Sequence, residues 1–451
     1  MWSQLTQLGD FFMTNSNSLL RRSCSTLQQL FFFAIMTLRR ERGEQDLITF
    51  VSALAIANVS SPILLAFPKH FASRLRRESS NSPSGPSGPQ SVLIPVQGGL
   101  FCLSMGLSLL IFWAFAWGVK GIFQTEISET TLRFSYWLLL LKSLETANKA
   151  LGVVVTLSVS VTLYVDEMLY LVVFCSASYI LYFWVGLGVL SFLFASLALE
   201  AFSLFGQLLL IALSSKLIFV FLARPREILE IFCSELREFF AKLLDQPFNF
   251  CYLDWFCLLL LGCFRQNEAA ALSIWIRLME LAHHAGRVYQ AFITQKLESR
   301  QLLGATEGLQ FEVTSGFKAL CLISLAFASV FFAFADAISS WLIQDPELKG
   351  LLAGVLRFGA IVAFPRILRP LLRTLLIIFG KKKRVRLISV VLEGLLSPTL
   401  GFFWRNCGFA ALSSIIIAAE IAELILLVLT WRGLQIDFPP LLGPLAEPRS
   451  A

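Results

Sequence analysis

Long apolar stretches with few charges recur along this 451-residue chain from about residue 18 to about residue 431. A helix crosses the hydrocarbon core of a bilayer with about 20 such residues. Continuous apolar runs differ from the alternating pattern of a transmembrane β-strand. Charged residues make up only 15% of the chain, against about 25% in a typical soluble protein. The pattern therefore predicts an all-α integral membrane protein.

Hydropathy divides the chain into about twelve predicted transmembrane helices. Together they require about 240 apolar residues, which leaves the rest of the chain for loops. The Ser-, Pro- and Gly-rich segment 78–91 predicts a flexible loop. The predicted spans are residues 18–37, 46–68, 94–118, 131–158, 166–191, 195–223, 248–264, 268–295, 312–343, 350–380, 385–405 and 408–431.

A charged segment divides the spans into two halves. Residues 224–247 carry apolar side chains at helical spacing, with Glu and Arg on the other faces. This predicts an amphipathic helix on the membrane surface, with a solvated linker helix as the alternative. A weak repeat, SALAI at 52–56 and AALSI at 270–274, favours two related halves. We predict two six-helix bundles with pseudo-two-fold symmetry, covering residues 1–223 and 248–432, and a tail at 433–451.

The net charge of +7 fits membrane topology better than binding to nucleic acid. Lys and Arg gather in alternate loops, and the largest groups lie near residues 69–77, 224–242 and 381–386. These loops predict cytoplasmic N- and C-termini in a multi-pass protein of the cell membrane, with a bacterial inner membrane as the expected location. The arginines at 39–42 fall on the predicted external side and break the pattern.

Four segments of the sequence resemble the multidrug and toxic compound extrusion (MATE) family, in the superfamily that includes polysaccharide and lipid-linked sugar flippases. They are EAAALSI at 268–274, ISSWLIQDPE at 338–347, FGKKK at 379–383 and KSLETANKALG at 142–152. The resemblance implies a monomeric secondary transporter with alternating access between two lobes. It also implies efflux of a small-molecule or lipid-linked solute, driven by H⁺ or Na⁺ as the coupling ion and without another cofactor.

Carboxylates inside predicted spans are candidates for ion coupling, because an ionisable residue in a membrane costs a few kcal/mol unless it has a partner or water. Asp254 lies at about the position where many MATE members carry a Glu. No Asp or Glu lies between Thr14 and Thr37, although the resemblance implies a helix-one carboxylate. The candidates for ion coupling are Asp254, Glu280, Glu420 and Glu423.

Basic residues in predicted spans are candidates for lining a substrate cavity. Arg366, Arg369 and Arg373 share one helical face. They could line a cavity that receives an anionic solute, or they could pair with Glu420 and Glu423. Glu145 and Lys149 are four residues apart, which predicts an ion pair that could also face the cavity.

The sequence does not indicate an enzyme or a metal site, because it carries no nucleophile–base motif, phosphate-binding loop or metal-ligand spacing. Two alternatives to an exporter stay open. Arginines facing a cavity would favour a flippase for an anionic lipid-linked precursor. The missing helix-one carboxylate would also fit a membrane scaffold without transport activity.

Overall fold

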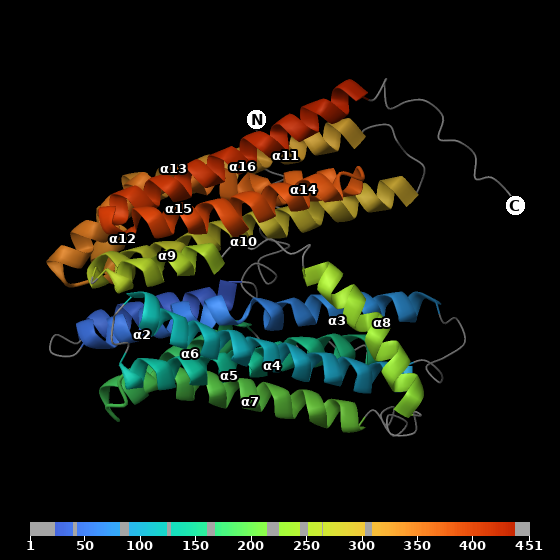
Figure 1. Ribbon diagram of the computed structural model, residues 1–451, viewed down its shortest axis with the longest axis horizontal. Coiled ribbons are helices and arrows are strands. Elements are labelled where there is room, and N and C mark those ends of the chain that lie inside the picture. The colour runs from blue at the N-terminus through green and yellow to red at the C-terminus, as the bar shows by residue number, and fades with distance from the viewer. Residues whose placement is uncertain are drawn as a thin grey trace, which may run out of the picture.

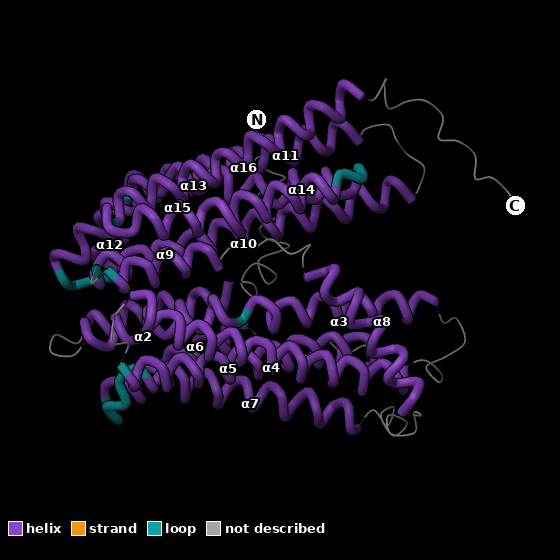
Figure 2. The backbone as a smooth tube through the Cα atoms, in the orientation of Figure 1, coloured by secondary structure: helices purple, strands orange, loops and turns teal. Residues whose placement is uncertain are grey.

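The computed structural model describes residues 23–38, 43–81, 90–123, 128–159, 167–213, 225–243, 251–263, 265–302 and 309–437. Within these ranges the chain is helical, and no strand occurs among them (Figure 2). The predicted all-α fold class is confirmed. The predicted tail lies largely outside the described residues, because the last helix reaches Asp437.

The helices form two lobes (Figure 1). The first lobe begins with a helix over residues 23–37 and continues with α2 (Gly43–Ser60), α3 (Pro62–Asn81), α4 (Gln90–Phe123), α5 (Glu129–Val159), α6 (Glu167–Phe183), α7 (Leu190–Leu213) and α8 (Pro225–Leu243). The second contains α9 (Cys251–Gly262), α10 (Gln266–Leu302), α11 (Leu309–Ala333), α12 (Ala335–Leu342), α13 (Pro346–Ile378), α14 (Lys382–Ser389), η1 (Val390–Leu396), α15 (Ser397–Trp404), η2 (Arg405–Cys407) and α16 (Phe409–Asp437).

Helix length and hydropathy support membrane crossing. Among the described residues, six helices are long and apolar enough to span a bilayer, and α2 with α3 makes a seventh if the two form one bent span. The apolar parts of α6 and α9 are shorter. The α2–α3 pair bends by 64° where a single straight span, 46–68, was predicted. Pro62 lacks the backbone N–H that would continue the helical hydrogen bonds, which accounts for the break.

One predicted span ends in the wrong place and another is divided in two. Helix α6 stops at Phe183 and not near residue 191, because Gly186 and Gly188 adopt positive φ angles of 78° and 57° in the turn that follows. The predicted span 312–343 is split into α11 and α12 at Phe334. Thus the glycine pair makes a turn between two helices inside a long apolar run.

Helix α8 packs against the first lobe through its apolar face. Phe239 is buried, and Phe232 and Leu236 pack in the same cluster, together with Phe67 of α3 and Leu100 of α4. For these residues the apolar face of the predicted amphipathic helix is covered by α3 and α4. In Figure 1, α8 crosses the ends of α3 and α4.

The lobes touch along α2. This helix packs against α4 and α5 of its own lobe and against α9 and α10 of the second lobe. Within the first lobe an aromatic group fixes it: the Phe50 ring lies 5.1 Å from that of Phe32 and 5.0 Å from that of Phe192. Because α2 packs against both lobes, its last turn lies between them.

Candidate functional site

A buried group of charges lies where the lobes meet, and Arg277 is its centre. Arg277 Nη2 donates to Asp254 Oδ1 at 2.8 Å, and Arg277 Nη1 donates to Glu280 Oε1 at 2.5 Å. The side chains of Arg277 and Asp254 are 4% and 1% exposed. The Arg277 guanidinium therefore bridges Asp254 and Glu280, two of the four predicted coupling carboxylates.

Three first-lobe side chains reach this group. Thr26 Oγ1 donates to Glu280 Oε2 at 3.3 Å. The Asn58 side chain, in the last turns of α2, interacts with the Asp254 carboxylate. Lys142 of α5 interacts electrostatically with Asp254 and Arg277. We call Asp254, Arg277 and Glu280, with Thr26, Asn58 and Lys142, the interlobe cluster.

The local sequence explains why this acid sits at the interface. Asp254 lies in the first turn of the short helix α9, where the helix dipole favours a negative charge. Its neighbours Leu253, Phe256 and Cys257 are fully buried, so apolar packing holds the turn in place. A buried carboxylate needs a cationic or hydrogen-bonding partner, and α10 supplies one at Arg277.

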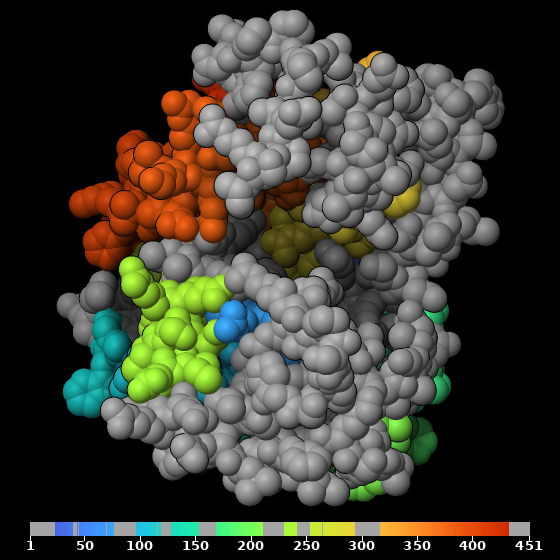
Figure 3. All heavy atoms as spheres, turned by 90° about the vertical axis from the view of Figure 1, so that its right-hand side faces the viewer, coloured from blue at the N-terminus to red at the C-terminus, as the bar shows by residue number. Residues whose placement is uncertain are grey.

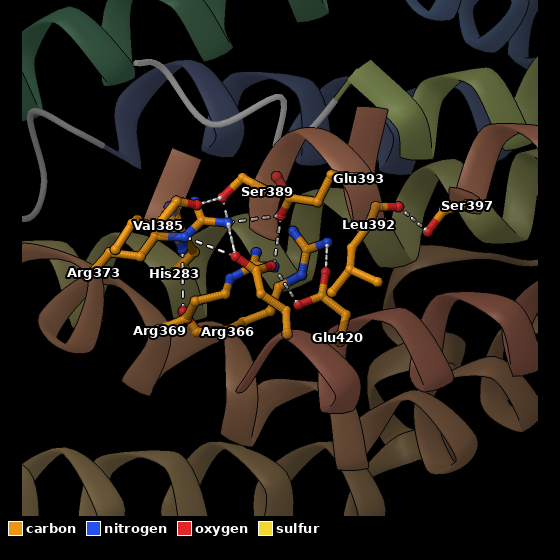
Figure 4. Close-up of polar contacts among 11 residues, drawn as sticks. His283, Arg366, Arg369, Arg373, Val385, Ser389, Leu392, Glu393, Ser397 and Glu420 are labelled. Atoms are coloured by element: carbon orange, nitrogen blue, oxygen red, sulfur yellow. Dashed lines mark hydrogen bonds and ion pairs between the residues drawn. The ribbon is translucent and has the colours of Figure 1, made fainter. Parts of the chain in front are cut away.

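A second charged group lies inside the second lobe and is drawn in Figure 4. Arg366 Nη2 donates to Glu420 Oε1 at 2.5 Å. Arg369 Nη1 donates to Glu393 Oε1 at 2.7 Å and also contacts Glu420 Oε2 at 3.0 Å. Glu423 accepts from Arg369 and from Arg373. We call these three arginines and three glutamates the second-lobe cluster.

The second-lobe cluster balances its charges within one lobe. Arg366, Arg369, Glu420 and Glu423 are fully buried, and their ion pairs join α13 to α16. The arginines thus pair with the two glutamates that the sequence offered as partners. This was the alternative to a cationic lining of a cavity for an anionic solute.

Glu393 enters the second-lobe cluster from a π-helix, η1. Pro398 follows four residues after Gly394 and cannot supply the N–H that an α-helix would direct to the Gly394 carbonyl. The backbone N–H of Ser397 instead bonds the Leu392 carbonyl, the wider π spacing. The extra residue in the turn changes which side chains face α13, and Glu393 points inward at 2% exposure.

A third polar group lies within the first lobe. Lys149 Nζ lies 3.6 Å from Glu145 Oε2, so these two residues form the predicted i,i+4 pair. Beside them, Glu200 of α7 accepts a hydrogen bond from Tyr170 at 2.8 Å and another from the Asn148 side chain. Lys149 is 61% exposed, so this pair lies nearer the surface than the other two clusters.

The sequence reading missed three charged residues in these clusters: Arg277, Glu393 and Glu200. Each lies inside a predicted span, so the cost of burying a charge was an available signal. Arg277 is three residues before Glu280 and thus on the same helix face, which could have indicated their pairing. No comparable spacing indicates the partners of Glu393, because they lie on other helices.

The described residues contain no group of three or more His, Cys, Asp and Glu side chains that could hold a metal ion. The carboxylates at the lobe interface already accept from Arg277. The interlobe cluster therefore offers two carboxylates whose ion pairs with Arg277 and hydrogen bonds to the first lobe can be rearranged.

Several solved structures share this fold. The chain aligns with the eukaryotic MATE transporter AtDTX14 over 97% of its length and 96% of that chain, at 14% identity and a TM-score of 0.63. An inward-facing multidrug resistance MATE transporter of the MOP superfamily aligns over 93% of this chain and 94% of its own, at 13% identity and a TM-score of 0.59. A MATE structure described as straight aligns over 94% and 95%, at 14% identity and a TM-score of 0.52.

No family model matches the sequence, and no curated protein matches it. The likeness is therefore one of fold: nearly the whole chain follows the two-lobed architecture of solved MATE transporters. The predicted two-lobed helical membrane fold is confirmed.

Proposed function

We propose that this protein is a secondary active transporter that exports a small-molecule solute by alternating access, coupled to a H⁺ or Na⁺ gradient. The observation that carries the proposal is the interlobe cluster in a MATE-like fold. Asp254, Arg277 and Glu280 lie in the second lobe, and their carboxylates are contacted from the first lobe. Binding of an ion or solute there would change the contacts between the lobes, as a coupled conformational change requires.

Asp254 is the proposed coupling residue, and Glu280 is its companion. A proton or Na⁺ on either carboxylate would weaken its pair with Arg277, because the guanidinium would face a less negative partner. The same change would weaken the hydrogen bonds that Thr26 and Asn58 make to Glu280 and Asp254 from the first lobe, so that the lobes could separate there. Glu420 and Glu423 are less suited to this role, because their ion pairs join α13 to α16 within the second lobe, whereas Asp254 and Glu280 also accept contacts from the first lobe.

The two ends of the molecule differ in a way that fits one state of such a cycle. At the end that carries α8, the surface is hollowed between the lobes and α10 side chains are visible at depth (Figure 3). Near the other end, Thr37 Oγ1 donates to the Leu342 carbonyl at 2.9 Å and links the lobes. The TM-score is 0.59 against an inward-facing MATE transporter and 0.53 against an outward-facing one.

We also propose that the α8 end is cytoplasmic. Helix α14 begins toward the same end of the molecule as α8 (Figure 1), and its first residues, Lys382 to Arg384, are basic and exposed. Lys and Arg concentrate in cytoplasmic loops. This orientation places the open side of the interlobe hollow toward the cytoplasm, where an exporter collects its solute.

The test is efflux from proteoliposomes loaded with ethidium, an organic cation, after a H⁺ or Na⁺ gradient is imposed. We expect gradient-driven efflux for the wild type and loss of the gradient dependence for Asp254→Asn. Asp336→Asn is the matched control, because Asp336 is 70% exposed and lies outside both clusters. Equal gradient-driven efflux by both variants would exclude Asp254 as the coupling residue.

The same vesicles separate the alternative functions. Translocation of a fluorescent anionic lipid without gradient-driven dye efflux would indicate a flippase. Neither activity in a correctly folded protein would indicate a scaffold. The pairing of Arg366 with Glu420 and of Arg369 with Glu393 argues against the flippase, because these arginines have carboxylate partners within their own lobe.

A further inference from the structure

The linker helix is attached to the first lobe by a buried carboxylate. Glu235 of α8 is 2% exposed, and its Oε1 lies 2.8 Å from Arg74 Nε. Its Oε2 accepts from His70 Nε2 at 3.1 Å and from Gln97 Nε2 at 3.2 Å. The three partners come from α3 and α4. We call this group the α8 latch.

Aromatic packing surrounds the α8 latch. The Phe239 ring of α8 meets the His70 ring edge-on, with centroids 5.5 Å apart. A Cβ on Gly99 of α4 would lie 3.1 Å from the Phe232 ring, so α8 and α4 approach closely. A solvated linker would not need a buried charge with three partners. The sequence of α8 thus encodes attachment to α3 and α4 as well as connection between the lobes.

Helix α3 is itself separated from the lobe interface by a joint. The chain bends by 64° between α2 and α3. The Ser61 N–H bonds the Asn58 carbonyl at 3.4 Å, and the next helix restarts with the Leu65 N–H on the Ser61 carbonyl at 3.0 Å. Beyond the break α3 packs against α4, α5 and α8. The joint therefore separates α2, which lies between the lobes, from α3, which is tied to the linker helix α8.

The joint lies next to the proposed coupling residue. Asn58, whose carbonyl takes part in the break, is also the α2 side chain that interacts with Asp254. A change in the charge or position of Asp254 acts on the last turns of α2, immediately before the bend. Movement there is carried to α3, and through the α8 latch to α8, at the hollowed end of the molecule (Figure 3).

We propose that α3 and α8 move as one lever about the Ser61–Pro62 joint, with Glu235 as the positioning residue that ties them together, and that this lever opens and closes the α8 end of the space between the lobes. The response of the lever to Asp254 rests on the proposed function. The tie between α3 and α8 does not, and the two parts have separate tests.

Hydrogen–deuterium exchange tests the tie. Loss of the Arg74–Glu235 ion pair is expected to speed exchange of the α8 amides by about 10- to 100-fold. We expect this in both Glu235→Gln and Arg74→Gln, whereas Arg74→Lys keeps the positive charge and retains more of the protection. Glu129→Gln is the control, because the Glu129–Arg133 pair is exposed and far along the chain from α8. Wild-type exchange of α8 in Glu235→Gln would overturn the proposal, whatever the transport result.

Spin-label distances test the lever. The spin labels are placed at exposed sites in a background without other cysteines. The distance between Leu65→Cys on α3 and Cys233 on α8 reports the tie between these helices. The distance between Cys233 and Lys383→Cys in the second lobe reports opening of the α8 end. Asp254→Asn is expected to shift the 233–383 distance and leave the 65–233 distance unchanged. A 65–233 distance that changes as much as the 233–383 distance would overturn the lever.

A second variant tests the joint independently of Asp254. Pro62→Ala restores the missing N–H, favours a straighter α2–α3 helix and is expected to shift the 233–383 distance. An unchanged 233–383 distribution in Pro62→Ala would overturn the joint. If Asp254→Asn has no effect on this distance while Pro62→Ala and Glu235→Gln act as stated, the lever stands and the coupling role of Asp254 fails.

Discussion

The second-lobe cluster makes a prediction about stability that can be worked from its charge balance. Three arginines face three glutamates in this buried group. Arg366→Met leaves two arginines against three glutamates, and Glu420→Met leaves the opposite imbalance. Removal of one partner from a buried ion pair costs about 3–5 kcal/mol. Each single variant should therefore lower the equilibrium ratio of folded to unfolded protein by a factor of about 10² to 10⁴.

The double variant Arg366→Met/Glu420→Met restores the balance at two against two. Replacement of a whole buried pair by apolar residues of similar volume is often neutral or stabilising. The double variant should be more stable than either single variant, which gives a large coupling energy in a double-mutant cycle. Arg369 keeps Glu393 and Glu423 as partners, so the remaining cluster stays paired.

The assay is equilibrium unfolding in mixed micelles, followed by tryptophan fluorescence. Arg357→Met is the control, because the Arg357–Asp336 pair is 47% and 70% exposed and such pairs contribute about 0–1 kcal/mol. A cost for Arg366→Met equal to that of Arg357→Met would refute the reasoning. A double variant as unstable as the sum of the two single variants would refute it as well.

Two further predictions concern packing and a hydrogen bond. Gly286→Ala should destabilise the protein, because its Cβ would lie 2.7 Å from the Ile367 carbonyl oxygen of α13. Gly350→Ala, whose Cβ would have no atom within 4 Å, should be neutral or stabilising by up to about 1 kcal/mol. The midpoints of thermal unfolding compare the two variants. Tyr182→Phe removes the 2.9 Å bond from Tyr182 Oη to Asp46 Oδ2 and should cost about 1.5–3 kcal/mol in the same measurement; an unchanged midpoint would contradict this.

The sequence was sufficient to predict the helices because membrane crossing imposes a length and a composition on each span. The predicted boundaries were wrong where a single residue changes the backbone conformation. These places are the α2–α3 break at Pro62 and the turn that contains Gly186 and Gly188. A hydropathy average does not register such single residues. The α2–α3 bend nevertheless separates α2, which contacts α9 and α10 of the second lobe, from α3, which packs against α4, α5 and α8.

The candidate site was only partly predictable for a different reason. The cost of a charge in the membrane marks single residues such as Asp254, but their partners lie on other helices. Arg277 is near in sequence to Glu280, whereas its bond to Asp254 joins α10 to α9. The apolar face of α8 was equally ambiguous, because burial against lipid and burial against α3 and α4 require the same residue types.

Alternating access itself is tested most directly by a link between the lobes at the end opposite α8. Thr37 Oγ1 donates to the Leu342 carbonyl there. The neighbouring side chains of Leu38 and Trp341 are exposed, so Leu38→Cys/Trp341→Cys can be joined by a bifunctional maleimide in a background without other cysteines. We predict that the link stops gradient-driven ethidium efflux and leaves the α8 end open to labelling, while either single variant treated in the same way stays active. Undiminished efflux by the fully linked protein would contradict the claim that the two lobes must move apart there during transport.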